Sequence, residues 1–162
     1  MRMDAVIEVP QGSRNKYEMD HEAGRIRLDR TLFTATSYPS DYGFLPGTLA
    51  EDGDPLDVLV LLESPTFPGC VISVRPVAMF LMSDEQMPDA KILAVPADDV
   101  RQAAMEDLTD VPEHLLGEIS HFFDVYKDLE PGKQSETRGW RGRREAEATI
   151  EDAIRRADEQ RP

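Results

Sequence analysis

The sequence is poor in cysteine and has no long apolar run. Cys70 is the only cysteine among the 162 residues, which excludes an internal disulfide. A chain with one free thiol is typical of reducing compartments, so we expect a cytoplasmic protein. The first residues contain no apolar signal core, and no later run approaches the roughly 20 apolar residues of a transmembrane helix. No membrane partner is therefore expected.

Basic side chains are also scarce. The chain has 18 lysines and arginines against 32 aspartates and glutamates, a formal net charge of −14. Nucleic-acid backbones are bound by basic surfaces, so this composition excludes a duplex-binding role. A small phosphate substrate stays open, because metal ions held by carboxylates reverse the local field. The length suits a single domain over residues 1–162, with 158–162 expected to fray.

The most distinctive stretch is EDGDPLD at residues 51–57, which leads straight into an apolar run. Its neighbouring carboxylates repel one another and raise one another's pKa unless a cation lies among them. Because no Cys or His is near, the oxygen ligands favour Mg²⁺ over zinc. A solvated acidic turn is the plain alternative. A calcium loop of the EF-hand type fails because Leu56 replaces a ligand and Asp57 replaces the glycine of the turn.

The hydrophobic pattern indicates a mainly β chain that ends in helices. Strands are predicted over 5–9, 16–19, 25–30, 58–62, 71–82 and 89–96. In the third, alternation assigns Asp29 to the face opposite Ile26 and Leu28. Pro76 predicts either a sheet edge or a bulge in the fifth. Residues 36–47 are expected to form an ordered loop. Helices are predicted over 99–107, 112–126 and 145–156. This order favours a closed or nearly closed β-barrel of the α+β class.

A second acidic group occurs at Asp84, Glu85 and Asp89. Lys91 shares a strand face with Asp89, because side chains two residues apart point the same way. By itself this group is typical of a charged hairpin. The chain also contains the side-chain types of a phosphate cradle: Lys16, Arg30, Tyr38, Tyr42, Tyr126 and Lys127. Each of them also has an ordinary structural interpretation, such as helix core for Tyr126.

Several short motifs together carry a family resemblance. They are IEVP at 7–10, NKYE at 15–18, LDR at 28–30, YPSDYG at 38–43, DGDPLD at 52–57, RPV at 75–77, MSDE at 82–85, DAK at 89–91, HFF at 121–123 and YKDLE at 126–130. In this order they resemble the family I soluble inorganic pyrophosphatases of bacteria. The resemblance implies a distorted five-stranded OB-like β-barrel with two main helices packed outside. It also implies Mg²⁺-dependent hydrolysis of pyrophosphate to two phosphates, in support of biosynthesis and phosphate metabolism, by a homohexamer.

The resemblance further implies roles for individual residues. The metal ligands would be Glu8, Asp52, Asp57, Asp84 and Asp89, with several Mg²⁺ per site and Mn²⁺ or Zn²⁺ as substitutes. The substrate would be held by Lys16, Arg30, Tyr42, Tyr126 and Lys127, with Glu18, Tyr38, Lys91 and Lys133 near them. Catalysis would be an in-line attack by a water that the metals activate. Asp54 is our choice for the base that accepts its proton, and Asp89 is the competing assignment.

Two functions of other classes compete with this one. A non-catalytic divalent-cation-binding protein would need the carboxylates alone, and the additional Lys, Arg and Tyr argue against it. A metal-dependent nucleotide hydrolase would need features that recognise a nucleotide. The sequence contains no P-loop and nothing typical of a base-stacking pocket. Phosphate release from pyrophosphate and ATP, measured in parallel, separates the alternatives.

Overall fold

Nine strands and two α-helices make up the computed structural model, which describes residues 1–162. The strands are β1 (Met3–Val9), β2 (Asn15–Asp20), β3 (Arg25–Thr31), β4 (Asp41–Phe44), β5 (Asp57–Val60), β6 (Val71–Asp84), β7 (Met87–Pro88), β8 (Lys91–Pro96) and β9 (Ser135–Gly142). The helices are α1 (Glu113–Val125) and α2 (Arg143–Glu159), and two 3₁₀ turns cover Val100–Gln102 and Leu108–Asp110.

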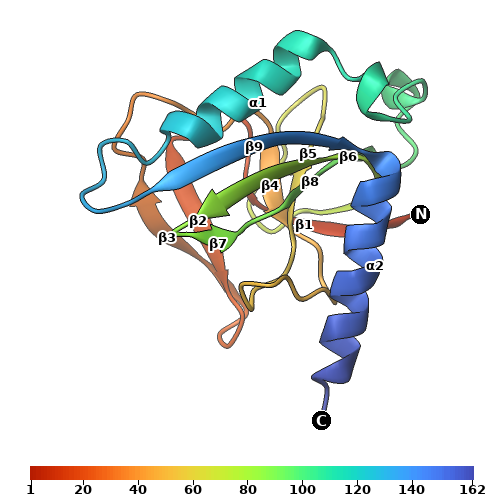
Figure 1. The fold of residues 1–162 in the computed structure, drawn as a ribbon, viewed down its shortest axis with the longest axis horizontal. Helices are drawn as coiled ribbons and strands as arrows, with labels where there is room; N and C mark the ends of the chain where they lie inside the picture. The colour runs from red at the N-terminus through yellow and green to blue at the C-terminus, as the bar shows by residue number, and fades with distance from the viewer.

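Five of the strands close into a ring in the order β1-β4-β5-β8-β6, because β6 pairs back to β1. Within this ring only β5 and β8 run parallel. β9 pairs with β6, and β2 and β3 form a separate two-stranded sheet on the side of the molecule away from α2 (Figure 1). The ring confirms the fold expected from the sequence, mainly β with two helices outside.

The ring strands β4, β5 and β8 bury both of their faces. Leu59 and Leu93 belong to the apolar cluster that α1 covers, whereas their neighbours Val58 and Ile92 belong to the cluster that α2 covers. This double burial explains why residues 58–62 form a continuous apolar run and do not alternate. α1 packs against β9, and α2 packs against β6 at the end of β9 (Figure 1). Neither helix is both long and apolar enough to cross a membrane.

Both main helices and the bulge at Pro76 are confirmed. α1 and α2 span the predicted segments, and α2 continues to Glu159, two residues into the tail that was expected to fray. The β6–β8 register shifts between Pro76 and Ala78, as expected where a proline cannot donate a ladder hydrogen bond.

Three other expectations are wrong. Residues 36–47 contain the strand β4. All four of its residues are buried, so its sequence has no alternation of apolar and polar residues that would reveal a strand. Residues 135–142 form β9, although the end of the chain was expected to be helical. The helix predicted over 99–107 is reduced to a 3₁₀ turn, because none of the residues of that turn is buried to support a longer helix.

β4 lies unusually close to β1. A Cβ atom on Gly43 would stand 1.8 Å from the carbonyl oxygen of Val6, so only glycine fits at this position. Asp41 anchors the start of β4. Its buried carboxylate accepts hydrogen bonds from the backbone N–H groups of Gln11 at 2.9 Å and Thr66 at 3.0 Å. These contacts fix β4, which places Tyr42 at the mouth of the ring.

Candidate active site

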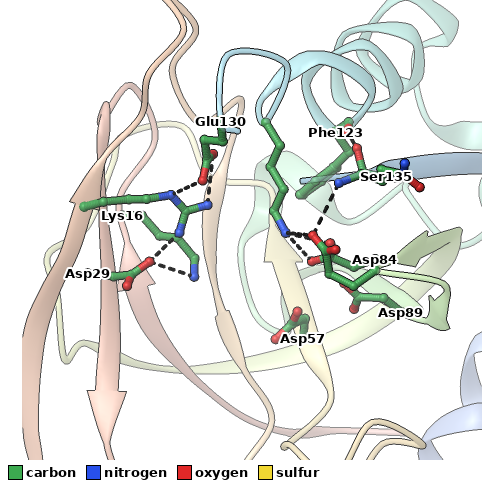
Figure 2. Close-up of polar contacts among 12 residues, drawn as sticks. Lys16, Asp29, Asp57, Asp84, Asp89, Phe123, Glu130 and Ser135 are labelled. Atoms are coloured by element: carbon green, nitrogen blue, oxygen red, sulfur yellow. Dashed lines mark hydrogen bonds and ion pairs between the residues drawn. The ribbon is translucent and has the colours of Figure 1, made fainter. Parts of the chain in front are cut away.

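A cleft of about 490 Å³ lies between the end of the ring, the β2–β3 hairpin and the turn after α1. Every residue that the sequence predicted for the site lines it: Glu8, Lys16, Glu18, Arg30, Tyr38, Tyr42, Asp52, Asp54, Asp57, Asp84, Asp89, Lys91, Tyr126 and Lys127, together with Lys133. Figure 2 shows Asp57, Asp84 and Asp89 on one side of the cleft and Lys16, Asp29 and Glu130 on the other. The cleft therefore has an acidic side and a side with mixed charges.

Strand register builds the acidic side around Lys91. The parallel pairing of β5 and β8 places Lys91 beside Asp57. The Lys91 Nζ donates to Asp57 at 2.8 Å, to the Tyr42 hydroxyl at 2.8 Å and to Asp89 at 3.1 Å. Burial lowers the pKa of Lys91, but the carboxylates of Asp57 and Asp89 raise it by more, so this buried side chain stays charged. Lys91 thus acts as the internal counter-ion of two predicted metal ligands.

Lys127 plays a similar part for Asp84. Its Nζ donates to the two carboxylate oxygens of Asp84 at 2.6 and 2.7 Å. Tyr126, just before it, ends the apolar face of α1, and burial raises the pKa of its hydroxyl. No three His, Cys, Asp or Glu side chains are close enough together in this structure to form a metal site. Lysine ammonium groups contact three of the five predicted ligands instead: Asp57, Asp84 and Asp89.

Three of the predicted metal ligands have perturbed acidities. Burial raises the pKa of the Glu8 carboxyl to about 7, although the Met19 N–H, at 2.7 Å, acts in the other direction. Burial also raises the pKa of Asp52 and of Asp89. These carboxylates have lost water without gaining enough positive charge in return, a condition that a bound cation relieves.

Asp54 differs from the other aspartates of the cleft. Its side chain is exposed and makes no hydrogen bond or ion pair with the protein. Only its backbone is held, because its N–H donates to the Asp52 carboxylate at 3.0 Å. Asp89, in contrast, is bound to Lys91 through both of its carboxylate oxygens. A carboxylate free of protein partners is available to accept a proton.

The β2–β3 hairpin brings the basic residues of the other side. Lys16 pairs directly with Arg30 across the two strands, an arrangement of like charges that is normally unfavourable. The register shifts between Lys16 and Tyr17, which leaves Asp29 as an extra residue in β3. Such a bulge redirects side chains, and both Asp29 and Arg30 line the cleft. Asp29 then accepts hydrogen bonds from Lys16 and Arg30.

Sequence reasoning missed several residues in or beside this cleft. Asp29 was assigned to the outer face, because alternation cannot reveal a bulge. Glu130 was not selected as a site residue. Its carboxylate nevertheless lies 2.8 Å from Arg30, although the two residues are 100 positions apart in the sequence. Phe44 also lines the cleft and packs edge-on against His21, with 5.1 Å between ring centroids. No local pattern marks these long-range contacts.

The comparisons with known proteins agree with this geometry. The family model of inorganic pyrophosphatase matches residues 5–158. The chain belongs to the inorganic pyrophosphatase family. A member from Streptomyces coelicolor is 58% identical over 160 residues, which cover 99% of this chain and 98% of the relative. The inorganic pyrophosphatase of Haloferax volcanii is 51% identical over 150 residues, 93% of this chain and 85% of the relative.

Solved structures of inorganic pyrophosphatases share the fold. The crystal structure from Thermus thermophilus superimposes with a TM-score of 0.95 at 50% identity, over 97% of this chain and 91% of that one. The structure from Helicobacter pylori gives 0.93 at 39% identity, over 97% and 94%. Hydrolysis of pyrophosphate to phosphate is the reaction of the inorganic pyrophosphatase family, and the cleft is the place where this chain collects the side chains suited to it.

Proposed function

We propose that this chain hydrolyses inorganic pyrophosphate to two phosphates in the cleft between the ring and the hairpin, with Mg²⁺ as its cofactor. The observation that carries the proposal is the direct pairing of Lys16 with Arg30 opposite a set of partly desolvated carboxylates. Two neighbouring basic groups suit an anion with two phosphates. Carboxylates facing them suit the divalent ions that accompany such an anion.

The donor atoms of the cleft are chemically suited to a divalent metal, although their side chains are not gathered around one point in this structure. Glu8, Asp52, Asp57, Asp84 and Asp89 offer only hard oxygen donors, which favours Mg²⁺. The raised pKa values of Glu8, Asp52 and Asp89 indicate unbalanced negative charge that a cation would offset. Bound Mg²⁺ supplies Lewis-acid polarisation of the phosphates and of the attacking water. Mn²⁺ and Zn²⁺ are substitutes to test.

The remaining chemistry comes from side chains of the chain itself. Lys16, Arg30 and Lys127 bind phosphate oxygens and stabilise the charge that develops on the attacked and leaving groups. Tyr42 and Tyr126 keep their protons because burial raises the pKa of both hydroxyls, so each can donate a hydrogen bond to a phosphate oxygen. Without substrate the Tyr42 hydroxyl donates to Asp57. Asp54 accepts the proton of the attacking water, because no protein group competes for its carboxylate. Lys91 stays with Asp57 and Asp89 and holds their positions.

Phosphate release from pyrophosphate tests the proposed function. We expect release with Mg²⁺, none after addition of a chelator, and much slower release from ATP in parallel. Release from ATP as fast as from pyrophosphate would favour the nucleotide hydrolase. Metal binding without release from either substrate would favour the non-catalytic cation-binding protein.

The base assignment has its own prediction. Asp54→Asn removes the proton acceptor while it keeps a side chain of nearly the same size. We expect kcat to fall by about 10²- to 10⁴-fold at neutral pH, the usual contribution of general base catalysis, with Mg²⁺ affinity nearly unchanged in calorimetry. Asp89→Asn is the matched variant. Unaltered turnover in Asp54→Asn, with a large loss in Asp89→Asn at unchanged Mg²⁺ affinity, would transfer the role to Asp89.

We also propose a cytoplasmic homohexamer without nucleic-acid or membrane partners. Large apolar side chains that are exposed on the single chain support association between chains: Phe67 is 64% exposed and Val71 is 58% exposed. The net charge of −14 supports the absence of nucleic-acid partners. Sedimentation equilibrium tests the oligomer, with six times the mass of one chain as the expected result and the mass of a monomer as the contradiction.

A further inference from the structure

Glu130 is a buried carboxylate in the turn that follows α1. It is 7% exposed and comes between two lysines of the cleft, Lys127 and Lys133. Its backbone N–H donates to the Lys127 carbonyl at 2.9 Å, and its own carbonyl accepts the Lys133 N–H at 3.3 Å. These two hydrogen bonds fix the backbone of Glu130 in the turn. From there its side chain reaches across to β3.

The partner of this carboxylate is Arg30. The Glu130 Oε1 lies 2.8 Å from Nε of Arg30, and the Arg30 Nη2 donates to Oε2 at 3.2 Å. The Nη2 contact is a hydrogen bond and the Nε contact is an ion pair without hydrogen-bond geometry, and together they hold the carboxylate against one edge of the guanidinium. Such a pair across 100 residues connects the hairpin to the turn after α1. Burial of the carboxylate makes the charge-assisted contact costly to lose.

The second acidic partner of Arg30 is held less firmly. Asp29 contacts only Nη1, and its side chain is 32% exposed against 6% for Glu130. Figure 2 shows the two acids at different places on this side of the cleft. A guanidinium has five N–H donors. Glu130 accepts a hydrogen bond from Nη2 and Asp29 accepts one from Nη1, whereas the buried Nε has no hydrogen-bond partner. The other N–H groups of Nη1 and Nη2, and the one that exposed Asp29 can release, are free for an anion.

We infer that Glu130 is a positioning residue, which orients Arg30 so that its unengaged N–H groups face the phosphate. The inference rests on the proposed function and deepens it. A neutral glutamine has one oxygen, and its NH₂ group would face an arginine donor, so Glu130→Gln keeps at most one of the two contacts. The guanidinium is then free to turn out of its plane.

Steady-state kinetics in a double-mutant cycle test the role. We expect Glu130→Gln to lower kcat/KM for pyrophosphate by about 10- to 100-fold, since small misplacement of a binding group costs this much. In the Arg30→Met background the same change should alter kcat/KM by less than about twofold, because the residue it positions is gone. Glu118→Gln, an exposed change on α1, is the matched control without effect.

Other outcomes would overturn the inference. Unchanged kcat/KM in Glu130→Gln would do so, as would an equal loss in both backgrounds, which would mean that Glu130 only supports the fold. Thermal melting of each variant verifies that it is folded at the assay temperature. Calorimetry with inorganic phosphate adds a readout that does not need turnover: Glu130→Gln should weaken phosphate binding only where Arg30 is present.

The two levels of the proposal fail differently. A wild-type chain that releases no phosphate from pyrophosphate contradicts the proposed function, and phosphate binding in the four proteins of the cycle still decides the role of Glu130. An active wild-type chain with an equally active Glu130→Gln variant contradicts the positioning role alone.

Discussion

The two sheets of the molecule bring different sets of charged side chains to one cleft from very different scaffolds. The ring strands β4, β5 and β8 are almost wholly buried, and they carry Tyr42, Asp57 and Lys91. The β2–β3 hairpin has no buried residue at all, yet it carries Lys16 and Arg30. Residues that hold an ion need fixed positions, and a buried strand supplies them. Residues that bind an incoming anion can lie on a sheet that contributes little to stability. The comparison predicts that ring substitutions act on folding and hairpin substitutions act on substrate binding.

Gly43→Ala should have the largest effect on the ring. The added methyl group would meet the backbone of Val6, which cannot move without breaking the pairing of β1 and β4. We expect a loss of about 3 kcal/mol or more in the free energy of unfolding, measured by urea denaturation. Gly117→Ala is the matched control. It lies exposed in α1 with open space around it, and should stabilise the chain by about 0.5–1 kcal/mol. Equal effects of the two changes would contradict the close contact of β4 and β1.

Lys91→Met should be next in size. Its ammonium group is the shared partner of Asp57 and Asp89, and its removal leaves two neighbouring carboxylates without a counter-ion. We expect a loss of about 3 kcal/mol in the absence of divalent ions. The loss should shrink in Mg²⁺, because the ion replaces the missing charge. Urea denaturation with Mg²⁺ and with a chelator measures both.

The control for Lys91 is Lys133→Met. Lys133 also lines the cleft, but it is exposed and forms no ion pair, so its loss should leave stability nearly unchanged. A loss in Lys91→Met that is the same with and without Mg²⁺ would show that this lysine does not compensate metal ligands.

Lys16→Met should have the smallest effect on stability and a clear effect on binding. Its ion pairs with Glu18 and Asp29 are partly exposed, so we expect less than about 1 kcal/mol of change in unfolding free energy. The KM for pyrophosphate should rise about tenfold, because one charge-assisted contact is lost. Arg27→Met, on the same hairpin but outside the cleft, should leave KM unchanged. A large loss of unfolding free energy in Lys16→Met would contradict the proposed difference between hairpin and ring.

Sequence patterns predicted most of the ring, and the side chains selected with the help of the family resemblance all line the cleft. They succeeded where the signal is local, as in the apolar run after Asp57 or the helical stripe that ends at Tyr126. They failed where the deciding contact is distant. β4 has four buried residues and no alternation, and β9 is polar because it pairs with β6 at the surface. Asp29 is redirected by a bulge, and Glu130 acquires its role only when α1 brings it to β3. The family resemblance supplied residues that periodicity alone would have left as ordinary surface charges.

Calorimetric titration of a doubly substituted hairpin is the most direct test of the central claim, the division of binding between the two scaffolds. In the Lys16→Met, Arg30→Met variant we expect Mg²⁺ affinity close to that of the wild type. Binding of imidodiphosphate, a slowly hydrolysed analogue of pyrophosphate, should weaken about 100-fold or more. An Mg²⁺ affinity that falls together with analogue binding would contradict the account.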